Sequence, residues 1–387
     1  MPASEVVITA GYDRSAHAPI ASTARASTRD MRRGRSDMCP VRRTHATSQV
    51  THYPSDVATP APSSLRSLPV LVTGASGFIG HHVATELLRR GAAVTVAVRD
   101  PARLPAVLAG GNARVLQVDG MRPGALAESI RAVRPACVFH LAGYGVAKHE
   151  RDETAMQRLN ADLLAELVDV LATDEHTDWP GLRLVHAGSA FEYGTLSEPL
   201  DESVQPQPFT PYGKSKLAGS EIVHRAVREH RLPALVLRPF TVFGHGERSG
   251  RLFPTLLAAR DRDDPVPLST GEQQRDFVLV QDVASAFVDL ALADASAVVQ
   301  RQGPFDRSTI NLASGRLHRV RDFALAAADA LGIARQRLQF GAIAQLPEEM
   351  PHLPVPVTRL RQALGHPLPG DLPVLLARAV AGSASRV

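Results

Sequence analysis

A glycine-rich segment between an apolar run and a helical pattern limits the folds open to this chain. Leu68–Thr73 reads as a buried strand, and the spacing of apolar residues from Val83 to Leu88 is that of a helix. Glycines at such a strand–turn–helix junction let the backbone turn tightly and approach a pyrophosphate, whose charge is held at the helix N-terminus. The segment therefore predicts a dinucleotide site whose residues include Gly74, Ser76, Gly77, Phe78, Ile79 and Gly80.

Strands and helices alternate after this segment. Further strands are expected at residues 93–98, 113–118, 136–141 and 182–186, with an amphipathic crossover helix over 154–171. This alternation predicts an α/β fold, a Rossmann-like doubly wound parallel sheet. We expect a Rossmann domain over 67–240. A smaller C-terminal substrate-binding domain is expected over 241–387, with some segments returning to the Rossmann domain.

Residues 1–66 differ from the rest in composition. They are rich in Ser, Thr, Ala, Arg and Pro and lack sustained periodicity, so they are expected to be a disordered extension. An organellar presequence would explain their arginines and serines. A start codon placed too far upstream explains them equally well, and we favour it.

Charge and cysteine content exclude several classes of protein. Residues 1–68 contain nine Arg and five acidic residues, which equals the net charge of +4, so the remaining chain is about neutral and no nucleic-acid surface is expected. The two cysteines, Cys39 and Cys137, are too few for a disulfide framework or a metal site. No apolar run approaches the roughly 18 residues of a membrane span. A cytoplasmic protein without membrane contact is expected.

The ends of the predicted strands supply candidate cofactor contacts. Arg99 follows the second strand, where an arginine suits a 2′-phosphate and an acid suits a free ribose, so NADP is favoured and NAD remains possible. In the alternative interpretation Arg99 is a solvated loop residue and Asp100 binds the ribose. Asp119 and Gly120 after the third strand are placed to border the adenine. The small residues Ala142 and Gly143, after Leu141, let a cofactor pass over the sheet.

A phenol and an ammonium group stand four residues apart at Tyr212 and Lys216, so they are neighbours on one helix face. A cation near a tyrosine lowers its pKa from about 10, by roughly 1 to 3 units. Ser189 follows the fifth strand, where ligands of parallel sheets bind, and is placed to donate a hydrogen bond to a carbonyl. The three residues together indicate acid–base catalysis, whereas a serine that caps a turn would be the simplest explanation of Ser189 alone.

At this point the chain resembles the extended short-chain dehydrogenase/reductases, specifically the NAD-dependent epimerase/dehydratase group that acts on nucleotide sugars. The resemblance rests on residues 73–80, the Ser189 segment, Tyr212 with Lys216, residues 238–244 and residues 275–283. It implies that Tyr212 is the general acid/base, that Lys216 binds the nicotinamide ribose, and that Ser189 orients the sugar oxygen. It also implies cofactor contacts from Pro239 and substrate contacts from Phe191, Thr241 and Arg275, the last to the diphosphate.

The resemblance leaves three activities open. Dehydratases of the group carry an acid pair directly after the serine position, where this chain has Ala190 and Phe191, so a 4,6-dehydratase is disfavoured. The first hypothesis is NADP-dependent reduction of a 4-keto-6-deoxy nucleotide sugar. The second is a nucleotide-sugar 4-epimerase with tightly bound NAD, and the third is a non-catalytic NAD(P)-binding regulatory protein. A homodimer is expected from the resemblance, and no metal.

Overall fold

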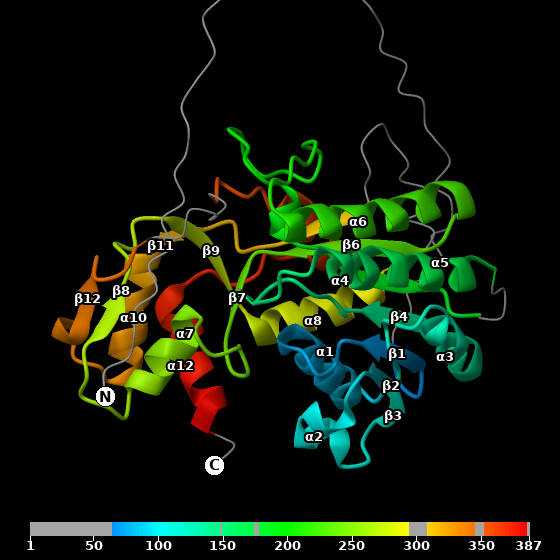
Figure 1. Ribbon diagram of the computed structural model, residues 1–387, viewed down its shortest axis with the longest axis horizontal. Coiled ribbons are helices and arrows are strands. Elements are labelled where there is room, and N and C mark those ends of the chain that lie inside the picture. The colour runs from blue at the N-terminus through cyan, green and yellow to red at the C-terminus, as the bar shows by residue number, and fades with distance from the viewer. Residues whose placement is uncertain (1–63, 148, 174–177, 294–307, 345–351, 385–387) are drawn as a thin grey trace, which may run out of the picture. The chain divides into compact units, whose positions relative to one another are not determined.

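The computed structural model describes residues 64–147, 149–173, 178–293, 308–344 and 352–384 (Figure 1). The predicted extension over 1–66 lies almost wholly outside this part of the chain. Its last residues differ from the prediction, because Leu65 is only 2% exposed and packs against the main core. The backbone N–H of Ser67 also donates to the carbonyl of Gly91 at 2.8 Å. The apolar side chain of Leu65 explains why ordered packing begins before the first strand.

The main sheet has seven strands in the order β3-β2-β1-β4-β5-β6-β10, and neighbouring strands are parallel. Their bounds are β1 Pro69–Thr73, β2 Ala93–Val98, β3 Arg114–Gln117, β4 Cys137–His140, β5 Leu184–Ala187, β6 Ala234–Pro239 and β10 Thr309–Leu312. Val, Leu and Ile make these strands apolar on both faces, as a sheet covered by helices requires. The predicted doubly wound parallel fold is confirmed.

Helices cover both faces of this sheet (Figure 1). One face carries α3 (Ala125–Val133), α4 (Glu153–Gln157), α5 (Leu163–Thr173) and α6 (Pro211–His230), and the other carries α1 (Phe78–Arg89), α8 (Val280–Ala291) and α11 (Thr358–Leu364). A short helix, α2 (Ala106–Ala109), precedes β3. The expected helix over 154–171 is interrupted, because residues 158–162 form a π-helical turn between α4 and α5.

A second group of elements is formed mainly from the C-terminal third. Strands β7 (Thr241–Phe243), β9 (Gln274–Leu279) and β11 (Leu317–Arg319) form one sheet, and β8 (Val266–Leu268) pairs with β12 (Leu338–Phe340). Helices α7 (Leu252–Ala259), α10 (Val320–Leu331) and α12 (Leu372–Ala384) pack against them. Their core is aromatic: the rings of Phe277 and Phe323 stack with centroids 4.2 Å apart.

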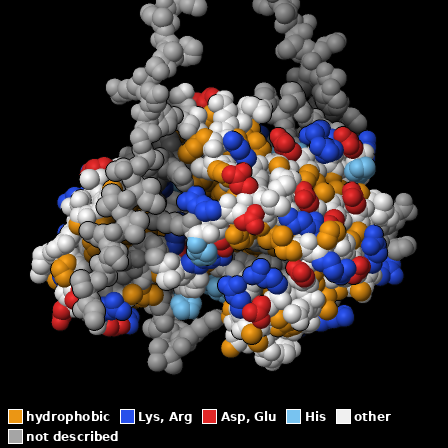
Figure 2. Space-filling model, viewed as in Figure 1, with side chains coloured by type: hydrophobic (Ala, Val, Ile, Leu, Met, Phe, Trp, Pro, Cys, Tyr) orange, Lys and Arg blue, Asp and Glu red, His pale blue; other side chains and the backbone are white. Residues whose placement is uncertain are grey.

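β10 lies in sequence between β9 and β11 of the second group but belongs to the main sheet in space. It pairs with β6 from Thr309 opposite Val236 to Leu312 opposite Pro239. On the face shown in Figure 2, acidic and basic side chains alternate over the helices of the main sheet. None of the helices in the described ranges is long and apolar enough to cross a membrane.

Candidate active site

The structure brings together the three residues predicted to be catalytic. Tyr212 and Lys216 lie in the first two turns of α6, which begins at Pro211 and is capped by Thr210, whose hydroxyl accepts the N–H of Gly213 at 3.0 Å. Ser189 follows β5, and its side chain is near enough to the Tyr212 hydroxyl to lower the pKa of Tyr212. The close approach depends on Gly213, where a β-carbon would lie 2.5 Å from the carbonyl oxygen of Phe191.

The pKa of Tyr212 differs from the sequence-based expectation. Burial raises it to about 12, and the nearby Ser189 side chain lowers it by less than burial raises it. Lys216 is only 4% exposed, and burial lowers its own pKa to about 8. The expectation took the lysine charge as the main influence on Tyr212, but desolvation disfavours the charged form of both groups and dominates here. Tyr212 is therefore a proton donor at neutral pH.

A buried ion pair fixes the backbone of Ser189. The carboxylate of Glu192 is fully buried; it accepts the Ser189 backbone N–H at 2.8 Å and the Nε–H of Arg238 at 2.8 Å. The guanidinium of Arg238 lies 4.6 Å from the centre of the Tyr193 ring. Both oxygens of Glu192 thus have structural partners, so this carboxylate is not available to a substrate.

The glycine segment has the shape that a dinucleotide phosphate needs. A β-carbon at Gly74, which has φ +73°, would lie 2.5–2.6 Å from the backbone of Leu141 and Ala142, and one at Gly80 would overlap the carbonyl of Gly74. Gly77 caps α1 without a side-chain hydrogen bond, and the first turn of that helix has no acidic residue. Free backbone N–H groups at an acid-free helix start bind phosphate. These residues therefore fit the pyrophosphate of NAD(P).

The other predicted cofactor residues lie at the same edge of the sheet, because they follow the carboxyl ends of parallel strands. Arg99 is exposed directly after β2. Asp100, its alternative, accepts the N–H of Ala102 at 3.1 Å and caps a short 3₁₀ turn. Asp119 is exposed after β3, and its carboxylate accepts the N–H of Met121 at 3.0 Å. The remaining predicted contacts are Gly120 after β3, Leu141, Ala142 and Gly143 after β4, and Pro239 at the end of β6.

The predicted substrate residues come from three elements. The ring of Phe191 is 39% exposed and meets the Tyr212 ring edge to face, with centroids 5.8 Å apart. Thr241 begins β7, and Arg275 lies on β9 opposite His318. Asp276 does not pair with Arg275, since its buried carboxylate accepts hydrogen bonds from Ser314 and Gly315. The simplest alternative for Arg275, a surface ion pair with its neighbour, is therefore not what the structure contains.

Three charged residues around Tyr212 are not among the predicted site residues, although two of them lie in the segment 248–253, which the sequence placed near the sugar ring. Glu150 raises the pKa of Tyr212, and Arg251 lowers it. Arg248 donates to Glu150 at 2.9 Å, and the same carboxylate accepts the N–H groups of Gly145 and Ala147 at 3.0 Å. This ion pair joins the loop after β4 to the loop after β7. No local pattern predicts it, because its partners are about 100 residues apart in sequence.

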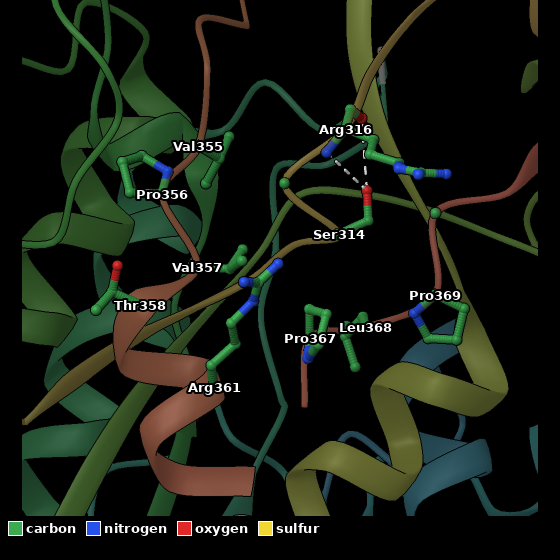
Figure 3. A pocket seen from close by; sticks show the side chains of 12 residues that line it. Ser314, Arg316, Val355, Pro356, Val357, Thr358, Arg361, Pro367, Leu368 and Pro369 are labelled. Atoms are coloured by element: carbon green, nitrogen blue, oxygen red, sulfur yellow. Dashed lines mark hydrogen bonds between the residues drawn. The ribbon is translucent and has the colours of Figure 1, made fainter. Parts of the chain in front are cut away.

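A pocket of about 610 Å³ lies elsewhere, between the turn after β10, residues 355–358, α11 and residues 367–370 (Figure 3). The side chains of Arg316 and Arg361 line it together with Val, Leu and Pro residues. Neither Tyr212 nor any other predicted site residue is among the residues that line it. It is therefore distinct from the candidate active site.

The sequence pattern of the NAD dependent epimerase/dehydratase family matches residues 70–302. The dTDP-6-deoxy-L-talose 4-dehydrogenase (NAD(P)(+)) of Kitasatospora kifunensis is 32% identical over 238 residues, which are 59% of this chain and 71% of that enzyme. The UDP-glucose 4-epimerase of Mycolicibacterium smegmatis is 30% identical over 243 residues, which are 56% and 71% of the two chains.

Solved structures are similar over most of the chain. MoeE5 in complex with UDP-glucose and NAD superposes with a TM-score of 0.65 at 28% identity, over 81% of this chain and 98% of MoeE5. A putative epimerase from Burkholderia cenocepacia superposes with a TM-score of 0.68 at 26% identity, over 82% and 99%. The similarity therefore includes the C-terminal elements as well as the main sheet.

Proposed function

Because the chain belongs to the NAD dependent epimerase/dehydratase family, we propose that it is an NADP-dependent reductase of the C4 keto group of a 4-keto-6-deoxy nucleotide sugar. It is an NAD(P)-dependent enzyme of the extended short-chain dehydrogenase/reductase type. The observation that carries the proposal is that Ser189 lies beside a Tyr212 whose pKa is raised by burial, so that the tyrosine holds its proton at neutral pH.

Each residue of the site has a defined task in this reaction. When bound, the reduced nicotinamide supplies the hydride that goes to C4. Ser189 holds the sugar oxygen, and Tyr212 donates its proton to that oxygen as negative charge develops there. Lys216 binds the nicotinamide ribose and stabilises the phenolate that Tyr212 becomes. Arg275 contacts the diphosphate, for which a fixed guanidinium fork is suited.

Two observations support reduction over dehydration and epimerisation. Glu192, the acid nearest to the serine in sequence, has both oxygens bound by structural partners, so this carboxylate is not available to help to expel water. Arg99 is exposed after β2, where we expect the adenosine ribose, while Asp100 caps a turn. An exchangeable NADPH suits a reductase, whereas an epimerase retains its cofactor.

The Tyr212→Phe variant tests the mechanism. We expect kcat for reduction of a 4-keto-6-deoxy nucleotide sugar to fall by about 10²- to 10⁴-fold, because the proton donor is lost. NADPH binding, measured by fluorescence titration, should stay nearly unchanged, because the phenol hydroxyl is not needed to hold the phosphates. Full activity in this variant would refute the mechanism.

The Arg99→Ala variant tests the cofactor. Fluorescence titration of cofactor-stripped protein should give a clear preference for NADPH over NADH that disappears in this variant. Arg103→Ala, which changes an exposed arginine four residues away, is the matched control and should keep the preference. Equal affinities in the unchanged protein would remove the argument for NADP.

A 4-epimerase is the second candidate, and the similarity to MoeE5 with NAD bound and to a UDP-glucose 4-epimerase supports it. Tight retention of NAD through purification and interconversion of UDP-glucose and UDP-galactose without added cofactor would favour it. A regulatory protein without turnover would show neither activity. Size-exclusion chromatography with light scattering tests the homodimer that we also expect.

A further inference from the structure

The pocket between the turn after β10 and residues 355–370 has no part in the proposed reaction. Its volume of about 610 Å³ is that of a small-molecule site, for which about 300–1,000 Å³ is usual. Its wall is largely apolar, because Val355, Val357 and Leu368 are only 4–7% exposed and three prolines lie beside them. None of the described residues that line it is acidic. A ligand can therefore bury apolar surface here without meeting a negative charge.

Two arginines also line the pocket, and neither guanidinium group has a partner among the described residues. Arg361 belongs to α11, and Arg316 belongs to the turn after β10. Figure 3 shows their guanidinium groups on either side of Ser314. A neighbouring surface arginine differs, since Arg319 forms an ion pair with Asp322 at 2.9 Å. The pocket therefore has two separate positive charges that no described carboxylate neutralises.

The wall that carries Arg316 is fixed in place. The buried carboxylate of Asp276 accepts the backbone N–H groups of Ser314 and Gly315, both at 2.8 Å. It also accepts the Ser314 hydroxyl at 2.9 Å. The alkyl stem of Arg316 lies against Gly370, where a β-carbon would be 3.0 Å from Cδ of the arginine. A pocket with such a wall is formed before a ligand arrives, which lowers the cost of binding.

We propose that this pocket binds a small organic dicarboxylate whose two acidic groups are joined by an apolar spacer. Arg361 binds one carboxylate and Arg316 the other, because a guanidinium group donates two parallel hydrogen bonds to a carboxylate. The spacer packs against Val355, Val357 and Leu368. A ligand with one acidic group would leave one of the two arginines without a partner. The inference goes beyond the proposed function, since the pocket shares no residue with the candidate active site.

A series of ligands tests the charge arrangement by isothermal titration calorimetry of the full chain at low ionic strength. Octanedioate has both carboxylates and a long spacer, octanoate has the same chain with one carboxylate, and butanedioate has both carboxylates on a short spacer. Octanedioate should bind about tenfold more tightly than either, because it alone reaches both arginines and covers the apolar wall. Equal binding of octanoate would overturn the proposal. Equal binding of inorganic phosphate would mean an adventitious ion only, and would also overturn it, as would no binding at millimolar concentrations.

Variants of the pocket locate the binding. Arg361→Gln and Arg316→Gln should each weaken octanedioate binding by about tenfold and remove its advantage over octanoate. Both arginines are exposed, so these variants should fold, which thermal unfolding checks. The matched control Arg319→Gln changes an exposed arginine three residues after Arg316 and should keep full affinity.

The variant Arg275→Gln separates this pocket from the candidate active site. It should keep full affinity for octanedioate, because Arg275 does not line the pocket. A loss of affinity in Arg275→Gln, or unaltered affinity in both Arg361→Gln and Arg316→Gln, would overturn the proposal. The titrations need no nucleotide sugar, so their outcome does not depend on whether the chain reduces one.

Discussion

At the scale of single residues, the buried ammonium group of Lys216, which the proposed reaction needs, lowers the stability of the folded protein. Its pKa falls from 10.5 to about 8 on folding, so the folded state holds this proton less tightly than the unfolded chain does. Stability rises with pH wherever the unfolded chain binds more protons. Below pH 8 the buried charge therefore opposes folding by its full amount, at most about 3 kcal/mol.

The Lys216→Met variant should accordingly be more stable than the unchanged protein at pH 7. Its free energy of unfolding should be higher by up to about 3 kcal/mol, and it should lose turnover. The gain should shrink as the pH rises from 8 towards 10.5, since the lysine then becomes neutral in both states. Urea titrations at pH 7 and pH 10 measure it. A variant less stable than the parent at pH 7 would show that the ammonium has a strong partner in the folded state.

Substitution in the ion pair of Glu192 and Arg238 should instead lower the stability of the folded protein. Removing one member leaves the other charge buried, and such losses cost about 3–5 kcal/mol. Arg238→Met should therefore lower the free energy of unfolding by about that amount. The double variant Arg238→Met with Glu192→Gln should lose less, because the amide keeps its acceptor for the Ser189 N–H without a charge. A double variant as unstable as the single one would assign the loss to packing around Tyr193.

Residue spacing predicted the members of the site but not their protonation. Tyr212 and Lys216 are neighbours by helix geometry, and Ser189 follows a strand end, so their meeting could be expected. The burial that raises the pKa of Tyr212 arises from several elements packed together, which spacing does not report. For the same reason the sequence did not predict the partners of Glu192, which are known only from the structure.

At the scale of elements, the glycine segment offers two substitutions with opposite outcomes. In Gly80→Ala, the new methyl group would overlap the carbonyl of Gly74, so α1 must move and stability should fall by about 3 kcal/mol or more. In Gly77→Ala, the methyl group meets only the Gly74 oxygen, at 3.1 Å, so the fold should persist. NADPH affinity should nevertheless drop, because the methyl group lies at the uncapped helix start. Thermal unfolding and fluorescence titration separate the two effects. Unchanged NADPH affinity in Gly77→Ala would show that the phosphate does not bind at this helix start.

Local patterns located the strands well where apolar runs are bounded by polar residues. The second strand was expected at 93–98 and is observed at Ala93–Val98. The helix over 154–171 was expected to be continuous, and its π-helical turn was missed. Asn160 in that turn bonds Tyr144 and Ser215, a tertiary requirement that periodicity along one helix does not contain.

At the scale of the whole molecule, the main sheet depends on a strand supplied late in the chain. Asn311 of β10 accepts the Tyr193 hydroxyl at 2.9 Å, and its amide donates to the carbonyl of Leu200 at 2.8 Å. The backbone N–H of Asn311 bonds the carboxylate of Glu202 at 2.9 Å. The segment after Ser189 is thus held by an element more than 100 residues away.

A chain that ends at residue 240 should therefore not fold. It lacks β10 and also α8, which packs against α1 in the main core. Circular dichroism and urea titration should give no cooperative transition for this fragment, whereas residues 64–387 should unfold cooperatively. A stable fragment with a sharp transition would show that the first six strands suffice.

The position of β10 also has a consequence for synthesis of the protein on the ribosome. β6 ends at Pro239, and its neighbour ends at Leu312, so roughly 70 residues must be translated before the β6 edge is covered. At about 5–20 residues per second this takes about 4 to 15 seconds. Throughout that interval the nascent chain presents an apolar strand with unpaired backbone groups, the kind of surface that chaperones bind and that drives aggregation. Slower translation between these strands should therefore lower the soluble yield, although the finished protein has the same sequence.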